Sequence, residues 1–229
     1  MNIRVFYHRE PNLINGDIAQ ITEQAAATIL NRIENSSPNI TLTISPKELD
    51  DRAQFHADKW VEETALHMQQ YSDAPRPVLT QPTGNVPQQD QRLIINYKSI
   101  SGDISGVIGE ALFSLLLVNH FQLIGSDFAH LRADKISGFY PDFGIYQPSN
   151  LLRQELNWDG NSIIGPSTPA EVKTISNFSK SQLKPKLRKA TEQIRNYWIR
   201  HNGTGASIIC VAARNTQIKS YDIVIIWGR

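Results

Sequence analysis

The sequence predicts an α/β protein with a mixed central β-sheet flanked by helices. Two observations lead to this fold class. Apolar residues recur at helical spacing in several long segments, whereas short runs of β-branched and aromatic residues in the second half are typical of strands. In that second half the elements follow the order helix, strand, strand, helix, strand, strand, which favours a single α/β core.

The first 90 residues are expected to form a mostly α-helical part. Its predicted elements are a strand at Ile3–Tyr7 and helices over about Asp17–Asn35 and Pro46–Tyr71. Residues 72–90 are rich in Pro, Gly and Gln, a composition that sustains neither a helix nor a central strand. We therefore predict a Pro-rich linker at about 72–90, which separates residues 1–90 from a core at 91–229.

The core is expected to carry most of the sheet. Its predicted elements are a strand at Arg92–Tyr97, a helix over about Ser105–Phe121, strands at Pro141–Gln147 and Ala170–Ile175, a long basic helix, and strands at Ala206–Ala213 and Tyr221–Trp227. The basic helix is expected to begin near Pro185, because the missing N–H of a proline has no intrahelical partner in the first turn. Residues 148–168, rich in Pro, Asn and Gly, are expected to be irregular.

The composition indicates a cytoplasmic protein without a membrane segment. No stretch approaches the ~20 apolar residues needed to cross a bilayer, and the first residues lack the apolar region of an export signal. The single cysteine, Cys210, lies in an apolar run and is expected to be a buried thiol. Because the formal net charge is only +1, any surface that binds nucleic acid has to be local.

Two segments place acidic residues within otherwise apolar, strand-like sequence. One contains Asp142, and the other contains Glu171 and Lys173. Side chains alternate faces along a strand, so Glu171 and Lys173 point the same way. If Asp142 lies at the end of a neighbouring strand, two carboxylates and an ammonium group converge. Carboxylates of this kind bind Mg²⁺, and a metal beside a lysine suits the hydrolysis of a phosphodiester bond.

These residues resemble the PD-(D/E)XK nuclease superfamily, which includes most type II restriction endonucleases. Pro141-Asp142 matches its PD motif, and Glu171-Val172-Lys173 matches its (D/E)XK motif. The resemblance covers roughly residues 105–229 and implies a restriction-endonuclease-like core. It also implies that Asp142 and Glu171 bind Mg²⁺, with Mn²⁺ as an alternative ion, and that Lys173 serves the attacking water.

Two further matches to the superfamily lie on predicted helices. Glu110 precedes the Pro-Asp strand, at a place where the family often has a glutamate that helps to hold the metal. Gln193 and Tyr197 fit the Q-x-x-x-Y pattern of some branches and lie one turn apart. The resemblance thus adds Glu110 to the implied metal ligands and Gln193 to the implied catalytic residues. Asp159, in the long segment before Glu171, remains a rival for the first carboxylate.

Positive charge is concentrated next to this motif. Residues 173–200 carry a net charge of +7, and the rest of the chain carries −6. A basic helix is most often a solvated face, but one beside a phosphodiesterase motif is expected to follow a phosphate backbone and to bind it in a salt-dependent way. The residues expected to bind nucleic acid are Lys180, Lys184, Lys186, Arg188, Lys189, Arg195 and Tyr197.

Other catalytic classes lack their motifs in this chain. The histidines at positions 56, 67, 120, 130 and 201 show no metal-ligand spacing such as H-E-x-x-H. Neither G-x-S-x-G nor G-x-x-x-x-G-K-[ST] occurs. The sequence therefore argues against a zinc hydrolase, a serine hydrolase and a P-loop ATPase.

The function expected from these patterns is that of a Mg²⁺-dependent DNA endonuclease of the restriction or phage-defence type. Because one such site cuts one strand, cleavage of both strands calls for a homodimer or a second chain. One alternative is a nuclease subunit activated by an ATPase or helicase partner, and another is a non-catalytic nucleic-acid-binding module with a degenerate nuclease fold. RNA stays open as a substrate, because the catalytic groups contact phosphate and do not read bases.

Overall fold

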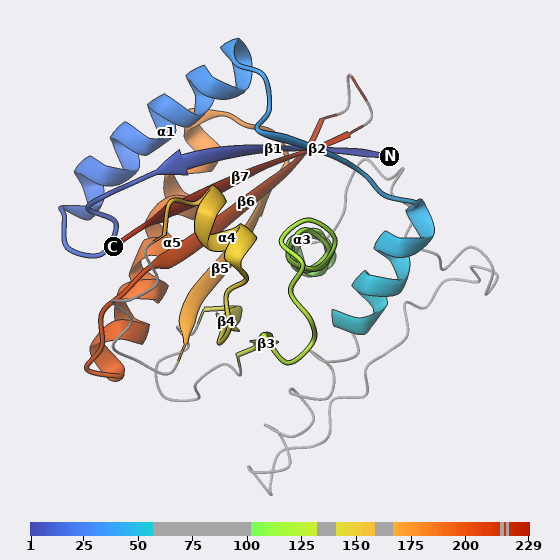
Figure 1. Cartoon of the computed structure of the whole chain (residues 1–229). Helices are drawn as coiled ribbons and strands as arrows, with labels where there is room; N and C mark the ends of the chain where they lie inside the picture. Colours follow the sequence, from blue (N-terminus) through green and yellow to red (C-terminus); the bar gives the residue numbers. More distant parts are fainter. Residues whose placement is uncertain (57–101, 132–140, 159–166, 216–217, 219) are drawn as a thin grey trace, which may run out of the picture.

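The computed structural model describes residues 1–56, 102–131, 141–158, 167–215, 218 and 220–229. Within these ranges, strands form one mixed sheet of seven in the order β2-β1-β7-β6-β5-β4-β3 (Figure 1). The strands are β1 Asn2–Arg9, β2 Ile40–Thr43, β3 Phe128–His130, β4 Phe143–Ile145, β5 Thr168–Ile175, β6 Ser207–Asn215 and β7 Ser220–Gly228. β1 runs parallel to β7 and β5 parallel to β6, whereas the other neighbouring pairs are antiparallel.

Helices cover both faces of the sheet and make three layers. The helices are α1 Ile18–Asn35, α3 Gly102–Asn119, α4 Asn150–Glu155 and α5 Lys180–Arg200, and residues 46–56 are also helical. One apolar core lies between the sheet and α1 with α5. A second core lies on the opposite face, beneath α3, α4 and the helical segment 46–56 (Figure 1). The predicted class, an α/β protein with a mixed sheet flanked by helices, is confirmed.

Several predicted elements agree closely with the structure. The strand expected at Ile3–Tyr7 lies within β1, and the helix expected to start near Asp17 is α1. Asp17 is its N-cap, and the carboxylate accepts the backbone N–H of Gln20 at 2.8 Å, which satisfies a donor that has no partner within the helix. In the second half, the remaining predicted elements that fall on described residues correspond to α3, β4, β5, α5, β6 and β7.

Other expectations are wrong or fall elsewhere. The basic helix begins at Lys180, so Pro185 lies inside α5, where it is exposed and interrupts the helical bonding near the N-terminal end. Residues 148–168, expected to be irregular, contain α4, which Ser149 caps by accepting the N–H of Leu152. The strands β2 and β3 were not predicted. The helical residues expected at 57–71, the linker at 72–90 and the strand at Arg92–Tyr97 lie outside the described residues.

The sheet contains strands from both parts of the chain, before and after the expected boundary at residue 90. β1 and β2 come from the N-terminal part, and β1 pairs along its length with β7 near the end of the chain. α1 packs against α5 in the same layer. The sheet is therefore not confined to residues 91–229, and the N-terminal part contributes strands as well as helices.

Two simpler expectations concern burial. Cys210 is a free, buried thiol as predicted, and burial raises its pKa above the ordinary value. Among the helices that the structure describes, we find none long and apolar enough to cross a bilayer.

A glycine sets the distance between α3 and β5. A Cβ atom at Gly109 would lie 2.6 Å from Cγ2 of Thr174 and 3.1 Å from Cγ1 of Val172, closer than packed side chains allow. Both neighbours lie on β5, so the absence of a side chain lets the helix approach the strand. Glu110, the next residue on α3, is thereby held near the acidic end of this strand.

We predict that Gly109→Ala destabilises the protein by about 1–3 kcal/mol, because the added methyl group forces α3 away from β5. The measurement is the free energy of unfolding in urea. Gly106→Ala on the same helix is the matched control, since nothing lies within 4 Å of a Cβ there. We expect this control to be neutral or to stabilise by up to ~1 kcal/mol through helix propensity. Equal effects of the two substitutions would contradict the packing argument.

Candidate active site

The register of β4 and β5 brings the two motif carboxylates together. Phe143 pairs with Ala170, so Asp142, just before β4, lies beside Glu171. The backbone N–H of Asp142 donates to Oε2 of Glu171 at 3.2 Å. In return, the backbone N–H of Val172 donates to Oδ2 of Asp142 at 2.8 Å. Each carboxylate is thus held by the backbone of the other segment.

Lys173 completes the motif on the same face of β5. Its ammonium group forms an ion pair with Oε1 of Glu171, whose side chain is fully buried. Ile175, two residues further along β5, belongs to the core beneath α1 and α5. Because side chains two residues apart share a face, Glu171 and Lys173 point toward this helical layer, as the alternation predicted.

Glu110 reaches the same site from α3, together with an unexpected histidine. Ligand atoms of Glu110, His130 and Asp142 all lie within 4.8 Å of one another. Nε2 of His130 is 3.3 Å from Oε2 of Glu110. His130 ends β3, where its backbone pairs with Phe143 of β4. Two carboxylates and an imidazole at these separations suit the ligand shell of a divalent cation.

A second histidine lies behind Glu110. His56 is buried, and its Nε2 is 3.0 Å from Oγ of Ser114 on α3. Its other nitrogen, Nδ1, is 3.7 Å from Oε2 of Glu110 and has no hydrogen-bond partner among the residues that the structure describes. Burial lowers the pKa of His56 to about 4, so the imidazole is neutral at pH 7.

The site is electrostatically unfavourable for its own carboxylates. Burial raises the pKa of Asp142 to about 6, and the nearby charge of Glu110 adds to this effect. Burial also raises the pKa of Glu171 well above its ordinary value, with a further increase from Asp142. Lys173 acts in the opposite direction on both groups. Among the described residues, Lys173 is the ammonium group that acts on both carboxyls, and a divalent cation would offset the negative charge that it leaves.

Two residues expected to bind nucleic acid have other roles in the fold. The Tyr197 ring is 1% exposed, and its hydroxyl lies 2.7 Å from Oγ of Ser167. The guanidinium group of Arg195 donates to the backbone carbonyls of Leu13 and Gly16, at 2.6 Å for Gly16. Tyr197 is therefore a core residue, Arg195 fastens the turn after β1 to α5, and the prediction that they bind nucleic acid does not fit either position.

The lysines of α5 fall into two groups. Lys180 and Lys184 both form ion pairs with Glu23 on α1, and Arg188 pairs with Glu192 one turn along α5. Lys186 and Lys189 are exposed and form no ion pair with any residue in the described ranges. The pKa of Lys186 is lowered by burial and by the charges of Lys173 and Lys189, so these cations lie near one another beside the site.

The remaining predicted site residues are less directly placed. Gln193 is buried on α5, with an exposed fraction of 7%, and its catalytic role stays a prediction. Asp159, the rival carboxylate, lies outside the described residues. The hydrogen bonds between Asp142 and the Glu171 strand support Asp142 as the first carboxylate of the pair.

Sequence reasoning missed His56 and His130. Both were set aside because the histidines show no regular ligand spacing, but the two belong to different elements that meet only in the folded chain. A local motif could not have found them. The available signal is that His130 stands shortly before the Pro-Asp segment in the sequence.

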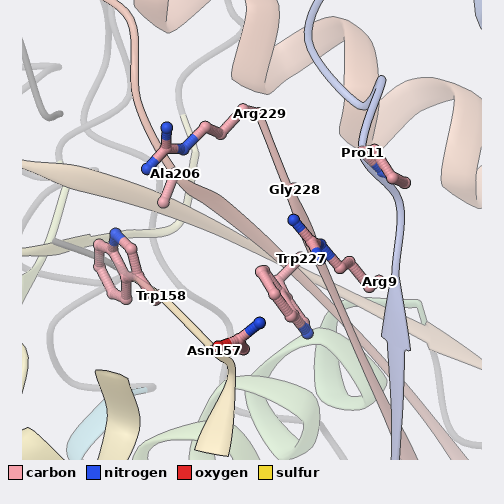
Figure 2. A pocket seen from close by; sticks show the side chains of 8 residues that line it. All are labelled: Arg9, Pro11, Asn157, Trp158, Ala206, Trp227, Gly228 and Arg229. Atoms are coloured by element: carbon pink, nitrogen blue, oxygen red, sulfur yellow. The ribbon is translucent and has the colours of Figure 1, made fainter. Parts of the chain in front are cut away.

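A separate pocket lies away from these residues. Its volume is about 140 Å³, and its lining includes Arg9, Trp158, Trp227 and Arg229. Figure 2 shows the two indole rings and the two arginine side chains around it, and the Arg9 guanidinium lies 5.2 Å from the centre of the Trp227 ring. None of the motif residues lines this pocket. It therefore does not contribute to the chemistry of the candidate site.

Comparisons with known protein families, with curated proteins and with solved structures find no match to this chain. The candidate site consists of a carboxylate pair at the start of β4 and on β5, and a lysine on the same face of β5. A glutamate from α3, a histidine from β3 and a histidine from the helical segment 46–56 lie close by.

We predict that Asp142→Asn changes how stability depends on pH in metal-free protein. Unfolded carboxyl groups titrate near pH 4. Because folding raises the pKa of Asp142 to about 6 and that of Glu171 as well, the folded state binds more protons between these values. The free energy of unfolding therefore falls as pH rises through this window. Asp142→Asn removes part of that fall.

The measurement is urea unfolding in EDTA at pH 4.5 to 7.5. The variant should gain stability relative to the intact protein as pH rises, because it lacks the Asp142 carboxyl group and its charge no longer raises the pKa of Glu171. A difference that is constant with pH would show that the Asp142 carboxyl has no raised pKa.

Proposed function

We propose that this chain is a metal-dependent nuclease with a restriction-endonuclease-like core, acting on DNA. The observation that carries the proposal is the convergence of Asp142, Glu171 and Lys173, tied together by backbone hydrogen bonds and an ion pair. Glu110 lies close enough to Asp142 to share a cation with it. Residues from separate elements thus supply the acidic and basic groups that the motif implied.

Each residue of the site has a distinct task in this proposal. Asp142 and Glu110 would hold the divalent cation, Mg²⁺ or Mn²⁺, and Glu171 lies beside Asp142 as the third carboxylate. The cation, when bound, supplies charge neutralisation to the phosphoryl group and lowers the pKa of water. Lys173 orients the water that attacks phosphorus and assists removal of its proton. The Glu171–Lys173 ion pair holds the ammonium group in position for this task.

Nucleic acid would reach the site along α5. Lys186 is an exposed cation near Lys173, and the exposed Lys189 lies near Lys186, so phosphates placed there would lie close to the carboxylates. A cytoplasmic enzyme of the restriction or phage-defence type remains our proposal for its setting. Two copies of the chain, or one copy with a second chain, would be needed to cut both strands of a duplex.

We predict that the intact protein cuts plasmid DNA with Mg²⁺ or Mn²⁺ and that Glu171→Gln and Lys173→Met each lower the rate by at least ~100-fold. Loss of Glu171 removes an acidic group from the cation site, and loss of Lys173 removes the group that serves the water. The measurement is the initial rate of conversion of supercoiled to nicked and linear DNA, with EDTA as the metal-free reference.

Lys47→Met is the matched control, because Lys47 is an exposed lysine that pairs with Asp51 on its own helical segment. Equal rates in all variants would reject the proposed site. No cleavage of DNA or RNA by the intact protein would leave a partner-activated subunit or a non-catalytic binding module. Rescue by an added ATPase or helicase partner would identify the first of these, and metal-independent binding without cleavage would identify the second.

We predict that Lys186→Ala and Lys189→Ala weaken DNA binding more than Lys180→Ala and Lys184→Ala do. All four are lysines of α5, but Lys180 and Lys184 already form ion pairs with Glu23. Each free lysine that contacts a phosphate should add ~0.9 to the slope of log K against log salt concentration. The measurement is fluorescence anisotropy with a short duplex and catalytically inactive Glu171→Gln protein. Equal losses for the two pairs would contradict this division.

A further inference from the structure

Glu110 is placed between two imidazole rings. Its Oε2 atom is 3.3 Å from Nε2 of His130 and 3.7 Å from Nδ1 of His56. Asp142 lies within the same small space on the side of His130. The acidic site therefore contains nitrogen atoms as well as oxygen atoms at ligand distances from one another.

The hydrogen bonds of His56 indicate which of its nitrogens carries the proton. The hydroxyl hydrogen of Ser114 is directed to the backbone carbonyl of Ala111 at 3.1 Å. The Ser114 oxygen therefore accepts from His56, so the proton lies on Nε2. Nδ1 then carries a lone pair and faces the Glu110 carboxylate, and within the described ranges it is buried without a hydrogen-bond partner.

Two acceptors that face each other in a buried place are unfavourable unless a cation or a proton lies between them. Donors bound to one ion at about 2.1 Å lie about 3.0–3.4 Å apart when they are adjacent and about 4.2 Å apart when they are opposite. The separations of 3.3 and 3.7 Å, and the 4.8 Å limit that includes Asp142, lie close to these values. Small side-chain movements would therefore complete a ligand shell.

We propose that Glu110, Asp142 and His130, with His56 as a further nitrogen donor, form a mixed nitrogen and oxygen site for a divalent first-row transition metal such as Mn²⁺. Mg²⁺ takes oxygen ligands and keeps several waters, whereas imidazole is a ligand of transition metals. The inference rests on the proposed function in taking this cluster as the metal site of the nuclease, and it replaces the expected preference for Mg²⁺ by a preference for a nitrogen-binding metal.

The test compares the binding of Mn²⁺ and Mg²⁺ to metal-free protein by titration calorimetry. We expect the intact protein to bind Mn²⁺ at least ~10-fold more tightly than Mg²⁺. His130→Gln should weaken Mn²⁺ binding by ~10–100-fold and Mg²⁺ binding much less. Pulsed EPR of the Mn²⁺-loaded protein should show coupling to nitrogen, and His130→Gln should reduce it.

His120→Gln is the matched control. Both histidines have a side-chain exposure of 19%, and each lies against one glutamate, Glu155 for His120 and Glu110 for His130. The control should leave the binding of both metals unchanged. His56→Gln is a second variant, because loss of a nitrogen donor there should lower Mn²⁺ affinity in a protein whose unfolding temperature shows that it is folded.

Several results would overturn the inference. One is equal affinity for Mn²⁺ and Mg²⁺ without nitrogen coupling, and another is unchanged Mn²⁺ binding in His130→Gln. A third is the absence of any metal binding, in which case a proton lies between the two acceptors. The proposed nuclease activity can fail independently of this inference. Mn²⁺ bound through His130 without cleavage of any nucleic acid would reject the nuclease alone, and Mg²⁺-dependent cleavage that needs Glu171 and not His130 would reject the inference alone.

Discussion

The candidate site depends on the position at which β4 begins, one residue after Asp142. The ladder between β4 and β5 covers three residue pairs and stops at Phe143 and Ala170. The backbone N–H of Val172 is bonded instead to the Asp142 carboxylate. Leaving a buried N–H unpaired costs about 1–3 kcal/mol, so the sheet itself holds this carboxylate in place. Asp142 thereby serves the backbone of β5 and points an oxygen toward the acidic cluster.

The same arrangement places more negative charge at the strand end than the fold can neutralise. Asp142 lies beside Glu171 and also near Glu110, and the charge of Asp142 raises the pKa of Glu171 while that of Glu110 raises the pKa of Asp142. A network that served stability alone would pair each acid with a base, as Arg4 and Asp222 do across β1 and β7 at 2.7 Å. Excess charge of one sign in a partly buried cluster is typical of functional sites.

The sequence predicted the elements that follow strong local rules. The apolar periodicity and the Asp17 cap located α1, and the acidic interruptions of two apolar runs located β4, β5 and the carboxylate pair. Weak local signals led to the errors. β2 and β3 have four and three residues at the edges of the sheet, too few for a period to appear. Pro185 suggested a helix start because its usual position is the first turn, but the helix had already begun at Lys180.

The histidines could not be predicted for a different reason. His56, Glu110 and His130 come from three elements, and they meet because Gly109 lets α3 approach β5 and because β3 pairs with β4. None of these contacts is visible in a local pattern. The sequence therefore located the residues on adjacent strands, and the family resemblance added Glu110, but the two histidines that meet Glu110 in the folded chain were missed.

The charge of α5 also needs the tertiary structure for its interpretation. The sequence counts every lysine and arginine of this segment equally, whereas α1 neutralises Lys180 and Lys184 through Glu23, and Arg195 is used by backbone carbonyls. Exposed ion pairs are screened by water and contribute little to stability, so α1 docks mainly through apolar contacts. Lys186, Lys189 and Gln193 recur at helical spacing and so share one side of α5. Because Lys186 is close enough to Lys173 for their charges to interact, this side of the helix adjoins the motif on β5, and its two lysines form no ion pair within the described ranges.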